Sequence, residues 1–98
     1  MSRVPSLSDL AEQELEEAAA YYEAQSPGLA SDFVEAVERE VNLLLEFPES
    51  APIIRADVRA RPLPRFPYTL LYISSRDELR ILAVMHQSRR PLYWLGRA

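Results

Sequence analysis

Residues 7–47 read LSDLAEQELEEAAAYYEAQSPGLASDFVEAVEREVNLLLEF, and they hold two apolar stripes at helical spacing. The first stripe comprises Leu7, Ala11, Leu15, Ala18 and Tyr22, widened by Leu10 and Ala19. The second comprises Leu29, Phe33, Val37, Val41 and Leu44. Apolar residues that recur in this way line one face of a helix, so the pattern predicts two amphipathic helices.

The segment QSPG (residues 25–28) separates the two stripes. Ser26 has the side chain of an N-cap, and Pro27 suits a first helical turn, where its missing N–H has no intrahelical partner. Ser6 and Asp9 have the spacing of a capping box at the start of the first helix. Because the connection is so short, the two helices are expected to lie antiparallel and side by side.

The second half of the chain changes to patterns that are typical of strands. Prolines are frequent in residues 48–67 and disfavour a helix there. Residues 58–63 alternate apolar and basic side chains, as an edge strand would, and residues 68–73 and 79–86 have strand composition. These segments predict an antiparallel meander in which residues 79–85 are central and the helices cover one face. The predicted fold class is α+β, an N-terminal antiparallel helical hairpin packed on a small antiparallel sheet of three to four strands.

Bulk properties limit the class of protein. The 98 residues are predicted to form a single domain, residues 1–98, because a chain of this length builds one hydrophobic core. Cysteine is absent, and no metal-ligand spacing or glycine-rich phosphate loop occurs, so we expect neither a metal nor a cofactor. The N-terminus lacks the apolar core of a signal peptide, and the longest apolar run, residues 81–85, is far shorter than a membrane span. A cytoplasmic location without membrane contact is therefore predicted.

The net charge of −4 conceals an asymmetry between the two halves of the chain. Residues 1–50 carry twelve acidic side chains against two arginines, a net charge of −10, whereas residues 51–98 carry nine arginines against three acidic side chains, a net of +6. Lysine is absent. Arginine presents a planar fork of donors that suits carboxylate and phosphate, although codon usage also favours it and a charged face is often only solvated.

The order of these features resembles the RelE/ParE toxin superfamily of type II toxin–antitoxin and plasmid-stabilisation systems. The resemblance covers about residues 7–95. It rests on the hairpin with its Pro-Gly break, FPESAP at 47–52, Arg61 ahead of Phe66-Pro67-Tyr68 and Tyr72, and ILAVMH at 81–86 with Arg89, Pro91 and Trp94. Two features depart from the family pattern. A full first strand is usual, and only residues 3–5 are available for it here. Members are also often basic overall.

The resemblance implies a toxin that arrests bacterial growth and is neutralised by a cognate antitoxin protein. RelE-like members cleave mRNA on the ribosome, and ParE-like members inhibit DNA gyrase, so the fold alone does not choose the target. The closing segment of residues 86–91 with Trp94 is closer to the ParE-like branch, which favours gyrase inhibition. A non-toxic interaction module of the same fold is a third alternative. A homodimer or a hetero-oligomer with the antitoxin is compatible with the apolar strands.

A metal-independent endoribonuclease would need a base, an acid and cations around the scissile phosphate. The candidate catalytic residues for this alternative are His86, Arg61, Arg80 and Tyr93. His86 is the only histidine and titrates near neutrality in its unperturbed state. Structural roles compete for two of them: a histidine that closes an apolar strand often bonds a local partner, and Arg80 would pair across the sheet with a carboxylate such as Asp57.

The candidate residues for binding the target or the antitoxin are Arg59, Arg61, Arg65, Arg89, Arg90 and Trp94. The five arginines are expected on or near one face, where an acidic antitoxin segment would cover part of them. A solvated strand face is the alternative for Arg61 and Arg65. Trp94 either covers the core or anchors a partner, since exposed tryptophan is frequent at interface hot spots.

Overall fold

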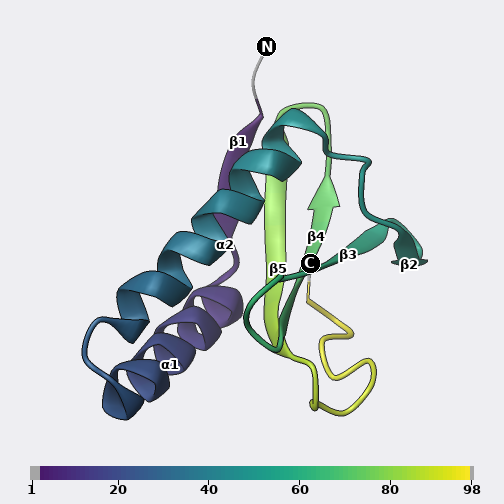
Figure 1. Cartoon of the computed structure of the whole chain (residues 1–98). Helices are drawn as coiled ribbons and strands as arrows, with labels where there is room; N and C mark the ends of the chain where they lie inside the picture. The colour runs from purple at the N-terminus through teal and green to yellow at the C-terminus, as the bar shows by residue number, and fades with distance from the viewer. Residues whose placement is uncertain (1–2, 98) are drawn as a thin grey trace.

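The computed structural model describes residues 3–97, which form two helices and a five-stranded sheet (Figure 1). The helices are α1 (Asp9–Gln25) and α2 (Leu29–Glu46). The strands are β1 (Val4–Leu7), β2 (Ile53–Arg55), β3 (Val58–Pro62), β4 (Tyr68–Ser74) and β5 (Glu78–His86). Met1, Ser2 and Ala98, the ends of the predicted domain, lie outside the described residues. No described helix is long and apolar enough to cross a membrane.

The helical hairpin is confirmed, but the predicted caps are wrong at both helix starts. Ser8, not Ser6, is the N-cap of α1, and its Oγ accepts a hydrogen bond from the Ala11 N–H at 3.1 Å. Ser26 ends α1 instead of starting α2, because Gly28, with φ of 89°, takes the N-cap position. The Glu23 carboxylate replaces the missing cap side chain and accepts from the Gly28 N–H at 3.1 Å. A carboxylate is favourable there because the helix N-terminus carries partial positive charge.

The sheet has the strand order β1-β5-β4-β3-β2, which corrects the prediction of three to four antiparallel strands. β1 pairs parallel to β5, with Leu7 opposite Ile81, so the sheet is mixed. β3 is not an edge strand, because β2 pairs antiparallel with its outer side. β5 lies between β1 and β4 and is therefore interior, while β4 holds the middle position. The two added strands are short, and neither shows a regular apolar–polar alternation.

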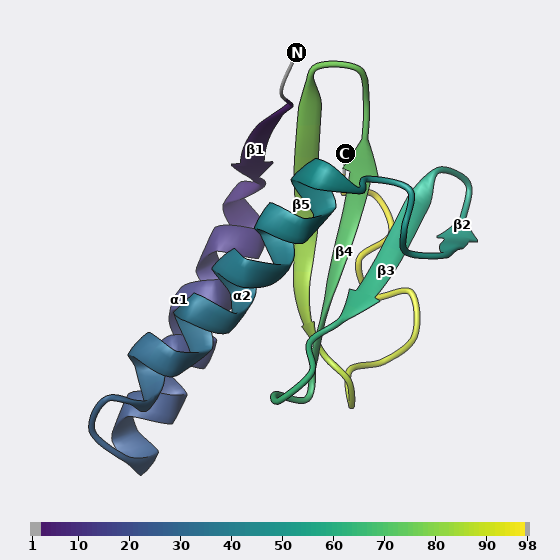
Figure 2. The same ribbon diagram turned by 45° about the horizontal axis from the view of Figure 1, so that its top comes forward.

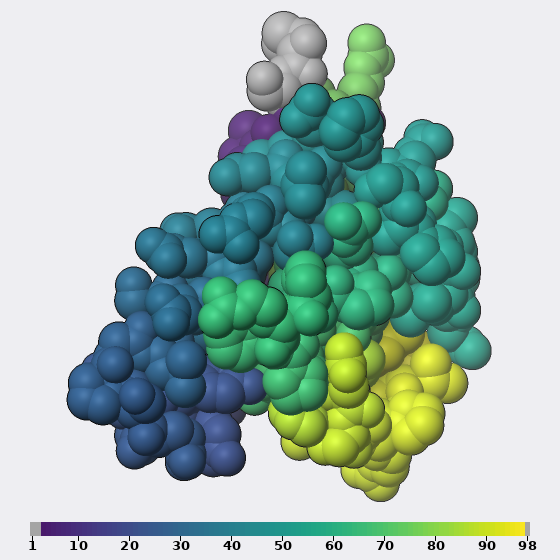
Figure 3. Space-filling view, in the orientation of Figure 1, coloured from purple at the N-terminus to yellow at the C-terminus, as the bar shows by residue number. Residues whose placement is uncertain are grey.

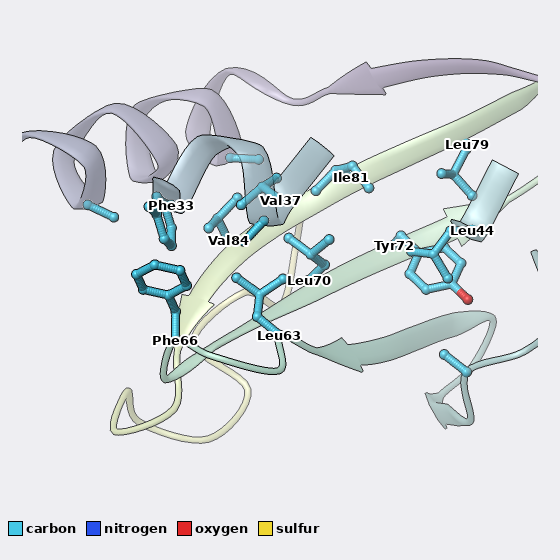
Figure 4. Close-up of a cluster of buried hydrophobic side chains, with 14 residues drawn as sticks. Phe33, Val37, Leu44, Leu63, Phe66, Leu70, Tyr72, Leu79, Ile81 and Val84 are labelled. Atoms are coloured by element: carbon cyan, nitrogen blue, oxygen red, sulfur yellow. The ribbon is translucent and has the colours of Figure 1, made fainter. Parts of the chain in front are cut away.

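The hairpin packs on one face of the sheet, as predicted, and encloses the main core (Figures 2 and 4). Phe33 of α2 is fully buried, and its ring meets Phe66 at 5.2 Å and Tyr68 at 5.1 Å between centroids. Tyr22 of α1 lies 5.2 Å from Phe33. Offset and edge-on aromatic contacts of this kind add to the apolar area that they bury. The cluster therefore joins both helices to the loop before β4.

The opposite face of the sheet carries a smaller core, which the C-terminal tail covers (Figure 2). Trp94 is only 4% exposed and packs with the group Val58, Leu71, Leu82 and Ala83. β5 has a bulge here, since Leu71 pairs with Ala83 and the next residue, Tyr72, pairs with Ile81. The structure thus takes the first of the two alternatives for Trp94: it covers the core and is not an exposed anchor.

Candidate functional site

A hollow of about 280 Å³ lies between α1 and the C-terminal end of β5. Its lining includes Glu14, Tyr21, Tyr68, His86, Arg89 and Tyr93. Glu14 and Tyr21 come from α1, Tyr68 from β4 and His86 from β5. Arg89 and Tyr93 come from the C-terminal tail. Two of the four candidate catalytic residues, His86 and Tyr93, therefore meet in one place.

Glu14 is the most highly connected side chain of the hollow. Its carboxylate accepts from the Val84 N–H at 3.0 Å, from the Tyr93 hydroxyl at 2.6 Å and from the Arg97 guanidinium at 2.9 Å. β1 ends at Leu7, opposite Ile81, so within residues 3–97 the edge of β5 beyond that point has no neighbouring strand on this side. The carboxylate takes the place of a strand there, since a backbone N–H that is removed from water needs an acceptor.

His86 is held by local contacts. Its Nδ1 accepts a hydrogen bond from the Ser88 N–H at 3.0 Å and lies 2.7 Å from the Ser88 hydroxyl. The imidazole also packs edge-on to the Tyr68 ring, with centroids 5.0 Å apart. Because Nδ1 is the acceptor, the neutral ring carries its proton on Nε2. The contacts are those of a histidine that closes a strand and caps the following turn.

Tyr93 has a strongly perturbed acidity. Burial, together with the hydrogen bond that its hydroxyl donates to Glu14, raises the pKa of Tyr93 from 10.0 to about 12. Arg89 and Arg97 oppose this change, and their guanidinium carbons lie 4.4 Å and 4.9 Å from the ring centroid. A phenol with this pKa stays protonated at neutral pH and acts as a hydrogen-bond donor, not as a base.

Tyr93 should make the stability of the protein fall in strong alkali. A pKa that is raised on folding adds stability below pH 10, the unfolded value, and this contribution disappears as the pH rises from 10 to 12. We expect Tyr93→Phe to flatten the fall in unfolding free energy over that range. Urea titrations at several pH values measure this slope. An unchanged slope in the variant would contradict the assignment.

Arg61 and Arg59 have structural partners away from the hollow. The Arg61 guanidinium forms a salt bridge with Glu40 of α2 at 2.9 Å, and the side chains are 30% and 5% exposed, respectively. Arg59 donates to the backbone carbonyls of Ala51 and Glu49 at 2.7 and 3.2 Å. Both arginines point from β3 toward the hairpin side of the sheet, where their register partners Tyr72 and Leu70 are in the main core.

Arg80, the remaining catalytic candidate, lies near the other end of β5 from His86. Its neighbours in the ladders are Ser6 of β1 and Ile73 of β4. Asp57, the carboxylate expected to pair with it, belongs to the turn between β2 and β3, and β4 runs between the two positions. The structure therefore does not assemble the four candidate catalytic residues around one point.

The other candidate arginines are exposed. The guanidinium carbon of Arg65 lies 5.6 Å from the centroid of the Phe66 ring. Arg89 lines the hollow, and Arg90 is the next residue in the sequence. The Gln87 N–H donates to the Pro67 carbonyl at 2.8 Å and joins the segment of Arg65 to the tail. Figure 3 shows the green segment before β4 beside the yellow tail on one face. A binding role for these arginines stays a prediction.

Sequence reasoning missed Glu14 and Glu40, the two carboxylates that organise these contacts. Glu14 lies three residues after the buried Ala11 and four before the buried Ala18. Glu40 has the same spacing from Val37 and Leu44. A carboxylate inside an apolar stripe is a signal of a paired, inward-facing acid, since burial of an unpaired charge is costly. That signal was present in the sequence.

The fold is a small α+β fold in which a helical hairpin packs on a mixed five-stranded sheet. A chain of the chromosomal ParDE TA system from P. aeruginosa superposes with a TM-score of 0.75 at 19% identity, and the match covers 86% of this chain and 95% of that chain. The family model described as the ParE toxin of the type II toxin-antitoxin system, parDE, matches residues 6–91. The chain belongs to the ParE toxin family. No match was found among curated protein sequences.

Proposed function

We propose that this protein is a cytoplasmic growth-arresting toxin that inhibits DNA gyrase by binding and that a cognate antitoxin neutralises it. Membership of the ParE toxin family supports the proposal. The observation that carries the choice of target is that Arg61 and Arg80 lie away from the hollow that His86 and Tyr93 line. Arg61 is tied to Glu40, His86 is bonded to Ser88, and Tyr93 is a protonated donor to Glu14. A protein that acts by binding alone needs none of these groups to be catalytic.

The exposed arginines of the tail and of the loop before β4 are the proposed contact residues. Arg89 and Arg90 are both exposed, and Arg89 lines the hollow. The loop that contains Arg65 is joined to the tail by the hydrogen bond from Gln87 to Pro67. Cations that are free to reorganise attract an acidic partner segment and speed its encounter. The name of the P. aeruginosa system, ParDE, supports a two-component arrangement for this chain as well.

The alternative function is cleavage of mRNA on the ribosome, and it is favoured by the position of His86, Arg89 and Tyr93 in the lining of the same hollow. In that case His86 would exchange a proton with the substrate, and Arg89 would face the phosphate. The two functions predict different outcomes for one substitution. His86→Ala abolishes toxicity in a nuclease, whereas a binding toxin with this variant still arrests growth.

The proposal is tested with the purified chain in two reactions, DNA supercoiling by gyrase and translation in a cell-free extract. We expect inhibition of supercoiling, no cleavage of mRNA, and inhibition by His86→Ala that is close to that of the unmodified chain. Arg89→Ala with Arg90→Ala should weaken inhibition about tenfold, which corresponds to the loss of roughly 1.4 kcal/mol of binding. Arg76→Ala is the matched control, since Arg76 is exposed in the turn at the opposite end of β5. Inhibited translation with intact supercoiling would overturn the proposal.

A further inference from the structure

The tail after β5 is joined to the rest of the protein by side chains and hardly at all by its backbone. Gln87 makes the last backbone hydrogen bond to another segment, to Pro67. Beyond it, residues 88–97, here called the strap, make backbone hydrogen bonds only within residues 86–97 in the described chain. The pairs are Arg89 to His86, Tyr93 to Arg90, Leu95 to Leu92 and Arg97 to Trp94. The strap thus has its own local turns and a single point of departure.

Among the described residues, two groups of side-chain contacts hold the strap closed. The first is the burial of Trp94 against the outer face of the sheet. The second is the Glu14 carboxylate, which accepts from the Tyr93 hydroxyl and from both Nη1 and Nη2 of Arg97, at 2.6, 2.9 and 3.2 Å. Arg97 Nη1 also donates to the Leu82 carbonyl at 3.1 Å. Both side chains of the Glu14–Arg97 pair are largely buried, with 16% and 12% exposure.

The closed strap carries unfavourable features of its own. Leu92 has a φ of 62°, in the left-handed region where a side chain with a β-carbon is strained. Leu92 and Leu95 are 41% and 49% exposed. Segments with local hydrogen bonds, few buried side chains and strained backbone are those that open without global unfolding. The attachments at Trp94 and Glu14 therefore decide whether the strap stays in place.

We propose that residues 88–97 open and close as a unit, that the hinge follows Gln87, and that Glu14 is the latch. Opening uncovers the apolar outer face formed by Val58, Leu71, Leu82 and Ala83, and it removes the wall of the hollow that Arg89 and Tyr93 provide. A ligand of the hollow and a ligand of the outer face then select opposite states of the strap. Opening of the strap does not depend on whether the toxin acts on gyrase.

Trp94 is the only tryptophan, so its fluorescence reports the strap directly. In Glu14→Ala we expect a red-shifted Trp94 emission, several-fold stronger quenching by acrylamide and increased binding of an apolar dye. Helical circular dichroism and the amide protection of β4 and β5 should persist. Glu17→Ala is the matched control, because Glu17 lines the same hollow from the same helix and is exposed. The control should leave Trp94 shielded.

The second variant combines Arg97→Ala with Tyr93→Phe, which removes both strap donors to Glu14 while the Glu14–Val84 hydrogen bond is kept. We expect the same change in Trp94 fluorescence as in Glu14→Ala, so this variant tests the proposal even if Glu14→Ala does not fold. The proposal is overturned if Trp94 stays shielded in the folded variants. It is also overturned if hydrogen exchange of the strap amides in the unmodified protein is as slow as that of β4 and β5.

Discussion

Phe33→Ala is expected to lower the free energy of unfolding by about 3–5 kcal/mol, the range for removal of a buried phenylalanine. Phe33 is fully buried and contacts the rings of Tyr22, Phe66 and Tyr68, which come from α1, the loop before β4 and β4 itself. Its loss therefore leaves a cavity where the hairpin meets the sheet. Domains of this size are stable by about 5–15 kcal/mol, so the variant should be close to unfolding at physiological temperature.

Urea denaturation followed by circular dichroism measures this effect. Tyr21→Ala is the matched control, because Tyr21 is an aromatic residue of the same hairpin that is 60% exposed. The control should change the unfolding free energy by less than about 1 kcal/mol, as surface substitutions do. A similar loss in both variants would mean that the aromatic cluster does not hold the hairpin on the sheet.

Arg61→Ala should destabilise the protein by about 2–3 kcal/mol, because it leaves the Glu40 carboxylate buried without its partner. Because the Arg61 side chain is 30% exposed, water screens part of the ion pair. The loss of unfolding free energy is therefore smaller than for a fully buried salt bridge. The residue was a candidate for catalysis and for binding. The structure predicts that a loss of toxicity in this variant follows from loss of stability.

A double replacement separates the structural role from a functional one. Arg61→Met combined with Glu40→Met removes both charges and keeps much of the volume, so stability should recover most of what Arg61→Ala loses. A toxin that acts through other residues should then be active again. If the double variant is stable and inactive, Arg61 has a direct role in binding or catalysis.

The parts of the fold that follow from local pattern were predicted correctly. Both helices show an apolar stripe of sufficient length, and β4 and β5, of seven and nine residues, consist mainly of apolar residues. β1 was missed because it contains Pro5, is partly exposed and has only four residues. Its position depends on the free edge of β5 and not on a pattern in the strand. β2 has only three exposed residues and a shifted register. Its pairing with β3 likewise depends on tertiary context.

The surface features were harder to predict from the sequence. His86 and Tyr93, two of the predicted catalytic candidates, line one hollow, but their partners Ser88 and Glu14 follow from the three-dimensional structure and not from the sequence. Trp94 is buried because the tail folds back over the bulged strand, and no periodic pattern encodes a path made of turns. Arg61 pairs with Glu40 across twenty-one positions of sequence. Contacts of such separation depend on the packing of α2 over β3.

We propose that this member of the ParE toxin family acts on DNA gyrase and not on the ribosome. The most direct measurement is pulse-labelling of new DNA and new protein in bacteria during the first minutes after induction of the chain. We predict that DNA synthesis falls first while translation continues, and that His86→Ala gives the same order of events. A collapse of protein synthesis before DNA synthesis would contradict the claim and would make the hollow around His86 a ribonuclease site.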